Sequence, residues 1–594
     1  MKSPIIYTKP ETISSAFADA VYDEIVKRGD PDKTVLLNYP TVYIHYWNKD
    51  LSDPDSKYDI YIGESNDVIE RTKQHYYDSS NPKNWQYDLS RSGATPNLVI
   101  IGHDHFNKSL TLDIENRMIQ YALGMSTVEN VRNGRGNPQN SYYPDVELDE
   151  LFSKIWRQLR RYDKRFFLTE AEIKDSAIFK ASPFHKLTDE QIKAQNLITD
   201  TVRNALSRFS AMGAVAAQNH QLVFVEGEAG TGKTVLTNST FYKLIDEGYK
   251  CQLLVNHEEQ VSVYKEIARK LQLPDYEKIV SRPTTFINNQ SITEPIDVAF
   301  IDEAHLLWTQ GKQTYRGNNQ LDDIMARAKV TVIMFDEYQI LTTEEYWEPA
   351  QIINKRVLSQ SQGNYLTLTN QLRMHAGNEI MDWIDAITKR FTVDKLVSNP
   401  SGYDLQIFDS PDDLDKAIRK KANEPDKKLS RIVASYDWDY SDRNTPHTGK
   451  PYWGVNIGDS FFKPWNRELL KSTLANMKKR SEKQSLRKLA WAEQPQTIDE
   501  IGSTFTIQGF DLVYAGVIIG PSVKYRNGKI EFHPECSKND KAIRNRTLSD
   551  GTKRKFAEYL LSHELRVLLT RGVKGMYIYA CDDELRNALK DSLI

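Results

Sequence analysis

The segment from Gln221 to Leu236, with the sequence QLVFVEGEAGTGKTVL, constrains the fold of this chain more than any other. It opens with the apolar run Leu222–Val225, which is typical of a buried parallel strand, and then turns through three glycines into a helical stretch. Glycine is needed there because backbone N–H groups must approach phosphate oxygens closely, in conformations that a Cβ atom would obstruct. The spacing Gly-x4-Gly-Lys-Thr in this strand–loop–helix context predicts a nucleoside triphosphate site in a parallel α/β domain.

The last residues of this loop have the most specific expected roles. Lys233 is expected to reach the β- and γ-phosphates, and Thr234 is expected to help hold Mg²⁺. The N-terminus of the following helix adds its partial positive charge. The predicted ATP contacts of the loop are Gly227, Gly230, Thr231, Gly232, Lys233 and Thr234.

Length and composition set the broad class. At 594 residues the chain is too long for one core, and about three to four domains are expected. The net charge of −3 argues against a uniformly basic coat, so any nucleic-acid contact must come from local patches. The three cysteines lie far apart, in neither a disulfide framework nor a metal-ligand spacing, as is usual in a reducing cytosol. With no long apolar run and no signal-peptide layout, we expect a soluble, cytoplasmic protein without a membrane partner.

Two acidic residues follow a second apolar run. The stretch Asp297–Ile301 ends in Asp302 and Glu303. Ligands of open parallel sheets bind at the C-terminal ends of the strands, so both side chains are expected beside the phosphate loop. Asp302 is predicted to bind the Mg²⁺ shell, and Glu303 to position and activate the attacking water. A helix cap is the alternative explanation for this pair.

Other polar residues complete the candidate ATP site. Gln191 precedes the phosphate loop and is placed to read an adenine edge, while Gln339 follows the next apolar strand as a candidate γ-phosphate sensor. Arg373 and Arg571 would singly be surface arginines, but in this order they are the cations that a second domain inserts toward a γ-phosphate. The remaining predicted nucleotide contacts are Gln508 and Gly509.

The series from Gln191 to Arg571 resembles superfamily 1 helicases, and most closely the bacterial Schlafen-related helicase-like family. The resemblance implies two RecA-like domains with ATP bound between them. Phe335 and Asp511 stand where the family usually has glycine and glutamate, but neither position supplies a phosphate ligand.

The N-terminal part of the chain offers a different set of polar residues. Two alternating strands, Thr41–Trp47 and Tyr58–Ile62, precede a helix on which Arg71 and His75 lie four residues apart and share one face. A later helix carries Glu115. Two strand tyrosines, an arginine, a histidine and a carboxylate are the groups that single-metal phosphodiester hydrolysis requires.

Each of these groups has both a chemical and an ordinary explanation. Glu115 would hold the divalent ion, Arg71 would neutralise the phosphate, and Tyr43 with His75 would deprotonate the attacking water. Tyr43 and Tyr61 are equally explained as strand aromatics. Arg71 and His75 are explained as a solvated helix face, and Glu115 as surface charge.

The order of these residues resembles the GIY-YIG nuclease family. The positions that carry the resemblance are, in order, Tyr43, Tyr61, Arg71, His75, Glu115 and Asn130. The resemblance implies a small α/β domain that cleaves with one metal ion, Mg²⁺ or Mn²⁺, in the roles just given. Thr41-Val42 replaces the Gly-Ile of the name motif, and Asn133, one turn after Asn130, is the alternative for the last position.

The expected architecture is therefore an α/β chain of several parts. These are a helical lead-in at 1–39, a GIY-YIG-like nuclease domain at 40–145, a basic linker helix region at 146–185, and RecA-like domains at 186–345 and 346–594, with a candidate accessory insertion at 437–495. The basic residues of the linker and of the insertion would line nucleic acid or form solvated helix faces.

The leading functional hypothesis is a metal-dependent endonuclease joined to an ATP-driven translocase or helicase on nucleic acid, with DNA favoured over RNA. A role in restriction or anti-phage defence follows only from the likeness of this architecture to restriction systems. One alternative is an NTP-operated switch that gates cleavage without movement. Others are an RNA-directed enzyme and a nucleic-acid binding protein with an inert nuclease-like domain. No oligomeric state is predicted.

Overall fold

The computed structural model divides the chain into two compact units. Unit 1 comprises Met1–Thr188, Asn238–Lys243 and Val263–Ile279, and unit 2 comprises Asp189–Thr237, Leu244–Ser262 and Val280–Ile594. The residues that the structure describes are 2–593, apart from 12–13, 15, 49, 51, 54–55, 80–83, 134–146, 213–219, 312–314, 373, 443, 445 and 447–448.

Unit 1 is built on a five-stranded mixed sheet in the order β1-β4-β2-β3-β5. The strands are β1 (Ile5–Pro10), β2 (Thr41–Asn48), β3 (Tyr58–Ser65), β4 (Asn97–Gly102) and β5 (Val128–Val131). β5 is parallel to β3, and the other neighbours are antiparallel. Because β1 lies within the segment expected to be a helical lead-in, that segment contributes an edge strand to the sheet as well as a helix.

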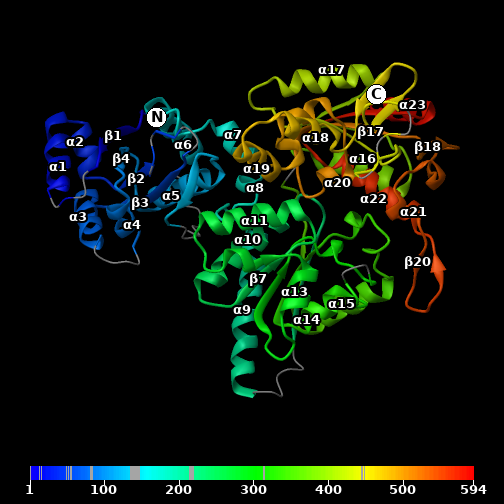
Figure 1. Ribbon diagram of the computed structural model, residues 1–594, viewed down its shortest axis with the longest axis horizontal. Helices are drawn as coiled ribbons and strands as arrows, with labels where there is room; N and C mark the ends of the chain where they lie inside the picture. The colour runs from blue at the N-terminus through cyan, green and yellow to red at the C-terminus, as the bar shows by residue number, and fades with distance from the viewer. Residues whose placement is uncertain are drawn as a thin grey trace. The chain divides into compact units, whose positions relative to one another are not determined.

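All eight residues of the central strand β2 are buried. Because successive side chains of a strand point to opposite sides, the strand is covered on both faces. Val42, Ile44 and Tyr46 pack into one core, and Tyr43 packs into the other. The helices whose side chains fill these cores are α1 (Phe17–Arg28) and α3 (Val68–Asp78) on the Tyr43 side, and α5 (Lys108–Gly124) and α6 (Leu148–Tyr162) on the other (Figure 1).

Helix α6 occupies part of the segment 146–185 that was expected to be a basic linker. Ile155 and Trp156 are buried in the core of unit 1, and the Trp156 indole donates a hydrogen bond to the Leu168 carbonyl oxygen at 2.9 Å. Arg157 and Arg161 lie on the exposed side of the same helix. Helix α6 is therefore an amphipathic core helix. Its cluster of basic residues made the regular spacing of its apolar residues hard to recognise in the sequence.

Unit 2 contains two parallel sheets, as expected for RecA-like domains. The first has the order β11-β6-β10-β9-β7-β8 and the second β12-β22-β17-β13-β16. The strands of the first are β6 (Gln221–Gly227), β7 (Cys251–Leu254), β8 (Val280–Ser281), β9 (Ile296–Ile301), β10 (Ala328–Phe335) and β11 (Tyr365–Leu368). The strands of the second are β12 (Asp404–Ile407), β13 (Ser430–Ala434), β16 (Gly502–Ser503), β17 (Leu512–Ile519) and β22 (Gly572–Ala580).

The boundary between the two sheets lies later than position 345, where it was expected. β11 pairs in parallel with β6, from Tyr365 opposite Phe224 to Leu368 opposite Gly227, so the first sheet extends to Leu368. The candidate insertion at 437–495 forms a small hairpin and two helices between β13 and β16. These elements are β14 (Gly454–Ile457), β15 (Phe461–Pro464), α18 (Glu468–Asn476) and α19 (Arg480–Lys488).

Helix α11 (Glu258–Lys270) begins in unit 2 and ends in unit 1. At its C-terminal end Lys270 is buried and donates hydrogen bonds to the carbonyl oxygens of Leu123 and Met125, both at 2.8 Å. Those carbonyls lie at the end of α5, where a helix leaves its last acceptors unsatisfied. Burial lowers the pKa of Lys270 to about 7. The segment Val263–Ile279 is thus an integral part of unit 1.

No helix in the part of the chain that the structure describes is long and apolar enough to cross a membrane.

Candidate functional site

The phosphate loop joins β6 to α10 (Lys233–Asp246), as the sequence predicts. Gly230 and Gly232 have φ angles of 90° and 78°, in the left-handed region that favours glycine. Lys233 donates hydrogen bonds from Nζ to the carbonyl oxygens of Gly227 and Glu228, at 2.6 and 2.9 Å. Thr231 closes the loop by donating from Oγ1 to the Glu228 carbonyl oxygen at 3.0 Å. The loop is therefore held by its own side chains in a rigid turn around the Lys233 ammonium.

Two oxygen ligands lie together beside this loop. Thr234 donates from Oγ1 to the Asp302 carboxylate at 3.0 Å. A hydroxyl and a carboxylate oxygen in contact are the donor set that Mg²⁺ takes in phosphate sites, so these two residues fit the ion. Glu303 follows in the left-handed region at φ 52°, and its carboxylate lies 3.3 Å from the Nε2 atom of His305. Burial lowers the pKa of His305, which keeps the imidazole neutral beside the predicted general base.

Three residues predicted separately from the sequence meet at one point. Arg571, which is fully buried, donates from Nη2 to the side-chain oxygen of Gln339 at 2.8 Å. Gln508 donates from Nε2 to the main-chain oxygen of Gln339 at 3.2 Å. The structure therefore brings the candidate sensor of the first sheet against the candidate arginine of the second.

The predicted adenine reader lies over the phosphate loop. Gln191 donates from Nε2 to the Gly232 carbonyl oxygen at 3.2 Å, and a Cβ atom on Gly232 would lie 2.2 Å from that nitrogen. Gly509 also has a positive φ, of 82°, and a Cβ atom there would lie 2.4 Å from Gln260 Nε2. Arg373, the other predicted cation, lies outside the described residues.

Charged residues that the sequence interpretation did not assign also surround this site. Asp336 accepts a hydrogen bond from Gln339 at 2.7 Å and lies 3.7 Å from Lys233 Nζ. Burial alone would raise the pKa of Asp336, but Lys233 and the other nearby donors hold it below its usual value. The carboxylate that follows the strand β10 could have been found by the same strand-end argument that found Asp302.

A second unassigned group is the ionic cluster around Glu228, the residue that follows Gly227 in the loop. Its carboxylate pairs with Lys389 at 2.6 Å and with Arg566 at 2.5 Å. Asp385 binds the same two cations, at 2.9 Å and 2.5 Å respectively. Two cations from the second half of unit 2 are thus held on an acid of the phosphate loop. Nothing in their spacing along the sequence indicated this.

Four residues of the GIY-YIG resemblance lie together in unit 1: Tyr43, Tyr61, Arg71 and His75. Glu115 belongs to α5, whose apolar side packs on the other face of the sheet. Tyr43 lies opposite Gly63 in the β2–β3 ladder. A Cβ atom on Gly63 would lie 2.4 Å from the Tyr43 hydroxyl, so this ring requires glycine at the end of the Tyr61-Ile62-Gly63 motif. The register of β2 and β3 therefore explains why a glycine follows Tyr61-Ile62: it faces the Tyr43 ring on the neighbouring strand.

Helix α3 supplies the two polar partners of Tyr43. Arg71 donates from Nε to the Tyr43 hydroxyl at 3.2 Å, and the Nε2 atom of His75 lies 3.1 Å from the same oxygen. Burial, together with His45 and Arg71, lowers the pKa of His75 to about 2, so its imidazole is neutral at ordinary pH. Burial also raises the pKa of Tyr43. The ring of Tyr61 lies close by, 6.1 Å from that of Tyr43 between centroids.

The structure places Asn133, rather than Asn130, next to Glu115. Asn133 accepts a hydrogen bond from the Ile62 N–H at 3.1 Å, and its amide nitrogen lies 3.5 Å from the Glu115 carboxylate. Asn130 instead donates to Asp59 at 2.7 Å, in a buried network that also contains Arg132. Asn130 lies within β5, which pairs with β3 as far as Val131, whereas Asn133 lies two residues beyond the end of that pairing.

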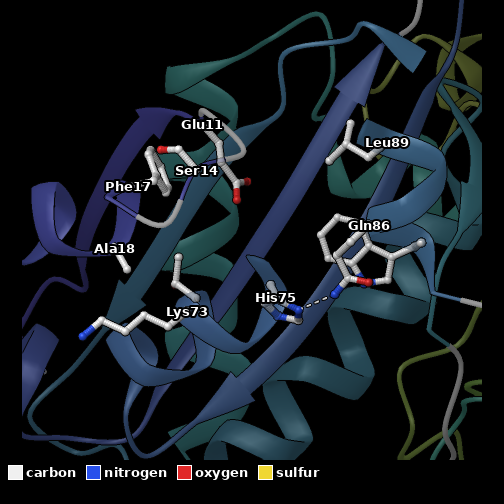
Figure 2. Close-up of a pocket in the computed structure, with 10 residues that line it drawn as sticks. Glu11, Ser14, Phe17, Ala18, Lys73, His75, Gln86 and Leu89 are labelled. Atoms are coloured by element: carbon white, nitrogen blue, oxygen red, sulfur yellow. Dashed lines mark hydrogen bonds between the residues drawn. The ribbon is translucent and has the colours of Figure 1, made fainter. Parts of the chain in front are cut away.

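A small pocket lies behind His75 (Figure 2). Gln86, on α4 (Trp85–Ser92), points toward His75, and its amide nitrogen lies 2.5 Å from Nδ1 of that imidazole. Glu11 also lines the pocket and contacts Nδ1 of the buried His45 at 2.6 Å. Gln86, Glu11 and His45 were not predicted, because no spacing along the chain connects them to the motifs.

Within the described residues, no group of three or more His, Cys, Asp or Glu side chains is arranged to hold a metal ion. The Glu115 carboxylate with the Asn133 amide beside it fits an ion that takes one protein carboxylate and completes its shell with water and phosphate.

Comparison with known proteins identifies the family of the larger, C-terminal part of the chain. Residues 220–582 match the family model described as the Schlafen group 3 DNA/RNA helicase domain. The chain belongs to the Schlafen group 3 family. The match runs from the strand that enters the phosphate loop to the strand that follows Arg571, so it contains nearly all of the predicted ATP site. The Schlafen-related, helicase-like prediction is thereby confirmed, and ATP and nucleic-acid binding follow from the domain.

A sequence relative and two solved structures are also similar. The "Uncharacterized protein YPL245W" of Saccharomyces cerevisiae is 30% identical over 439 residues, covering 68% of this Schlafen group 3 chain and 90% of its own length. The Dbp5 protein of S. cerevisiae bound to RNA and ADP BeF3 is 12% identical, with a TM-score of 0.28, covering 72% of this chain and 90% of its own. The Pif1 helicase from Candida albicans is 12% identical, with a TM-score of 0.26, covering 68% and 97%.

Proposed function

We propose that this Schlafen group 3 protein hydrolyses ATP to move along nucleic acid, and that unit 1 cleaves phosphodiester bonds with one divalent metal ion. DNA is the proposed substrate. The observation that carries the cleavage proposal is the meeting of Arg71 and His75 on the hydroxyl of Tyr43, with Glu115 held by Asn133 near the adjoining strand.

ATP hydrolysis is proposed to use the residues around the phosphate loop. Lys233 neutralises charge on the β- and γ-phosphates, and Thr234 with Asp302 would hold Mg²⁺, which supplies further neutralisation when bound. Glu303 accepts a proton from the attacking water, aided by a His305 imidazole that stays neutral. Arg571 and Gln339 are in direct contact, so a charge change at the γ-phosphate would reach both sheets through this pair.

Strand cleavage is proposed to use the groups around Tyr43. The Tyr43 hydroxyl lies between the neutral His75 imidazole and the Arg71 guanidinium, so Nε2 of His75 is placed to take the Tyr43 proton as Tyr43 takes one from the attacking water. Arg71 stabilises negative charge on the phosphate in the transition state. Glu115 would hold the divalent ion, which polarises the phosphate and the attacking water when bound.

The test is incubation of the purified protein with supercoiled plasmid and with structured RNA, with or without ATP and with Mg²⁺ or Mn²⁺. Lys233→Ala should abolish ATP hydrolysis, because it removes the positive charge that neutralises the β- and γ-phosphates. Glu115→Ala should abolish metal-dependent cleavage and leave strand-stimulated ATP hydrolysis intact. Cleavage by Glu115→Ala at the native rate would remove this residue from the site, and cleavage of RNA alone would replace DNA as the substrate.

An NTP-operated switch is the second candidate, and one contact favours it. Arg546, from the second half of unit 2, is buried and donates to the main-chain oxygens of Thr343 and Thr309 in the first half. A translocase would have to break and remake these hydrogen bonds in every cycle of ATP hydrolysis, whereas a switch would break them once. ATP turnover that increases with the length of single-stranded DNA supports translocation, and turnover independent of length supports the switch.

A further inference from the structure

Gln86 and His75 are in contact beside the small pocket, as Figure 2 shows. Arg71 is a hydrogen-bond donor only, a tyrosine hydroxyl both donates and accepts, and a neutral imidazole has one N–H and one acceptor nitrogen. His75 can therefore accept from Tyr43 through Nε2 only if its proton lies on Nδ1. The group that faces Nδ1 decides which of the two forms is present.

Gln86 is the group that faces Nδ1, at 2.5 Å. The oxygen and nitrogen of a glutamine amide have nearly the same shape, so their assignment follows from the hydrogen-bond network. With the nitrogen toward His75, the Gln86 side-chain oxygen is buried and has no hydrogen-bond partner among the residues that the structure describes. Both Arg71 and His75 would then donate to the Tyr43 oxygen. With the oxygen toward His75, one continuous chain of donors runs from Arg71 through Tyr43 and His75 to Gln86.

We propose that Gln86 is a positioning residue of unit 1: its side-chain oxygen accepts the Nδ1–H of His75 and so makes Nε2 the acceptor for the Tyr43 hydroxyl proton. This inference rests on the proposed cleavage function for its chemical purpose, but the tautomer that it assigns can be measured without any reaction. In the cleavage step the attacking water would give a proton to the Tyr43 oxygen as the Tyr43 proton passes to Nε2 and the remaining hydroxide attacks phosphorus. The water O–H and the original Tyr43 O–H bonds break, a new Tyr43 O–H and an Nε2–H form, and Nδ1–H keeps its bond to Gln86.

The packing of α4 suits Gln86 to this role, because the neighbouring residue anchors the helix. Trp85 stacks on Tyr61 with ring centroids 4.9 Å apart, and on Trp47 at 5.3 Å. Gln86 is itself 6% exposed. A side chain fixed by such packing holds its partner in one orientation, which is what a second layer around a reactive group must do. The buried imidazole of His45 lies 5.2 Å from that of His75 between centroids, and its own Nδ1 contacts Glu11.

The experiment compares Gln86→Met, which removes the acceptor and keeps the length, with Gln86→Glu, which can only accept. The chain has 12 histidines, and in protein labelled with ¹⁵N-histidine the His75 signal is the one lost in His75→Asn. We expect the Nδ1–H tautomer in the native protein and in Gln86→Glu, and a mixture or the Nε2–H tautomer in Gln86→Met. Plasmid nicking should fall at least tenfold in Gln86→Met and stay within about threefold in Gln86→Glu.

An Nε2–H tautomer in the native protein would overturn the inference, and so would nicking by Gln86→Glu as slow as that by Gln86→Met in folded protein. If the native protein does not nick any substrate, the proposed cleavage function fails, while the tautomers of the three proteins still decide the role of Gln86. Circular dichroism and the melting temperature of each variant separate loss of the fold from loss of the hydrogen bond.

Discussion

At the scale of single residues, the acid in the phosphate loop bears on nucleotide binding. Glu228 would lie near the phosphates of ATP, and in this structure its charge is taken up by Lys389 and Arg566. Arg566 is also held by Asp385, so the two acids and two cations form a closed network. An incoming triphosphate must compete with the Glu228 carboxylate for these two cations, and it is also repelled by that carboxylate. Charge-assisted contacts of this kind are stronger than hydrogen bonds between neutral groups.

Replacing Glu228 by Gln should therefore tighten ATP binding, by about five- to tenfold at low salt, because the repulsion is removed and the two cations become available. The measurement is the dissociation constant of a fluorescent ATP analogue at two salt concentrations. Asp382→Asn is the matched control, since Asp382 pairs with Arg390 on an exposed surface of the same half. Equal affinities in the native protein and Glu228→Gln would show that the network does not oppose binding.

The two neighbouring asparagines provide another test at this scale. Asn133→Ala removes an amide that contacts both the Ile62 main chain and Glu115, so we expect nicking to fall at least tenfold. Asn130→Ala removes a donor to buried Asp59 and should lower the free energy of unfolding by about 1–2 kcal/mol, with little effect on nicking by the folded protein. Urea unfolding and plasmid nicking of both variants check this. The opposite pattern would return Asn130 to the site.

At the scale of elements, helix α6 shows how basic residues can conceal a core helix. Its buried residues include Leu151, Ile155 and Leu159, which recur at four-residue steps, while Arg157 and Arg161 lie toward solvent. The helix therefore contributes to the stability of unit 1 whether or not its exposed side contacts nucleic acid. These two properties can be separated by substitution on opposite faces.

Trp156→Ala should lower the free energy of unfolding by about 3–5 kcal/mol, because it opens a cavity and leaves the Leu168 carbonyl oxygen without its donor. Arg161→Ala, on the exposed face, should change stability by less than about 0.5 kcal/mol. If the basic face does line nucleic acid, Arg161→Ala should weaken binding and reduce its salt dependence. Chemical unfolding and DNA titrations at several salt concentrations measure both effects. Equal destabilisation by the two variants would contradict the assignment of faces.

The elements differ in how far the sequence predicts them. Asp302 was expected beside the phosphate loop because the strands of a parallel sheet bring their C-terminal ends to one edge, and its carboxylate lies 3.0 Å from the Thr234 hydroxyl. The same sequence did not reveal β1, whose six residues become a strand only by pairing with β4. It did not reveal Gln86 or the Glu228 network either, because those contacts depend on tertiary packing and have no periodic signal. Asn130 was chosen over Asn133 for the same reason, since the end of the β3–β5 pairing decides between them.

At the scale of the whole molecule, the central question is whether the two proposed activities depend on each other. The candidate cleavage residues Tyr43, Arg71 and His75 lie in unit 1, and the candidate ATP residues lie in unit 2. A ligand shifts an equilibrium between two forms only by its difference in affinity for them. Nucleotide control of cleavage therefore requires that ATP and ADP favour different forms of the chain.

We expect plasmid nicking to proceed at different rates with ATP and with ADP, and Lys233→Ala to alter nicking although Lys233 lies outside unit 1. A time course without nucleotide, with ADP, with ATP and with a non-hydrolysable analogue measures this. Identical rates in all four conditions, with Lys233→Ala equal to the native protein, would mean that the two activities share only a chain. A response to the analogue equal to that of ATP would favour the switch over the translocase.

The burial of Lys270 at the end of α5 has a consequence for how such a gene can change. Unit 1 is discontinuous, because it takes in residues from beyond the phosphate loop that are encoded within the helicase region. A gene fission or recombination event near codon 188 would therefore separate α5 from the lysine that satisfies its last carbonyl groups. Neither product would inherit a whole unit 1. Selection should then keep the two parts of the gene together, whatever unit 1 does, for the physical reason that they share a helix.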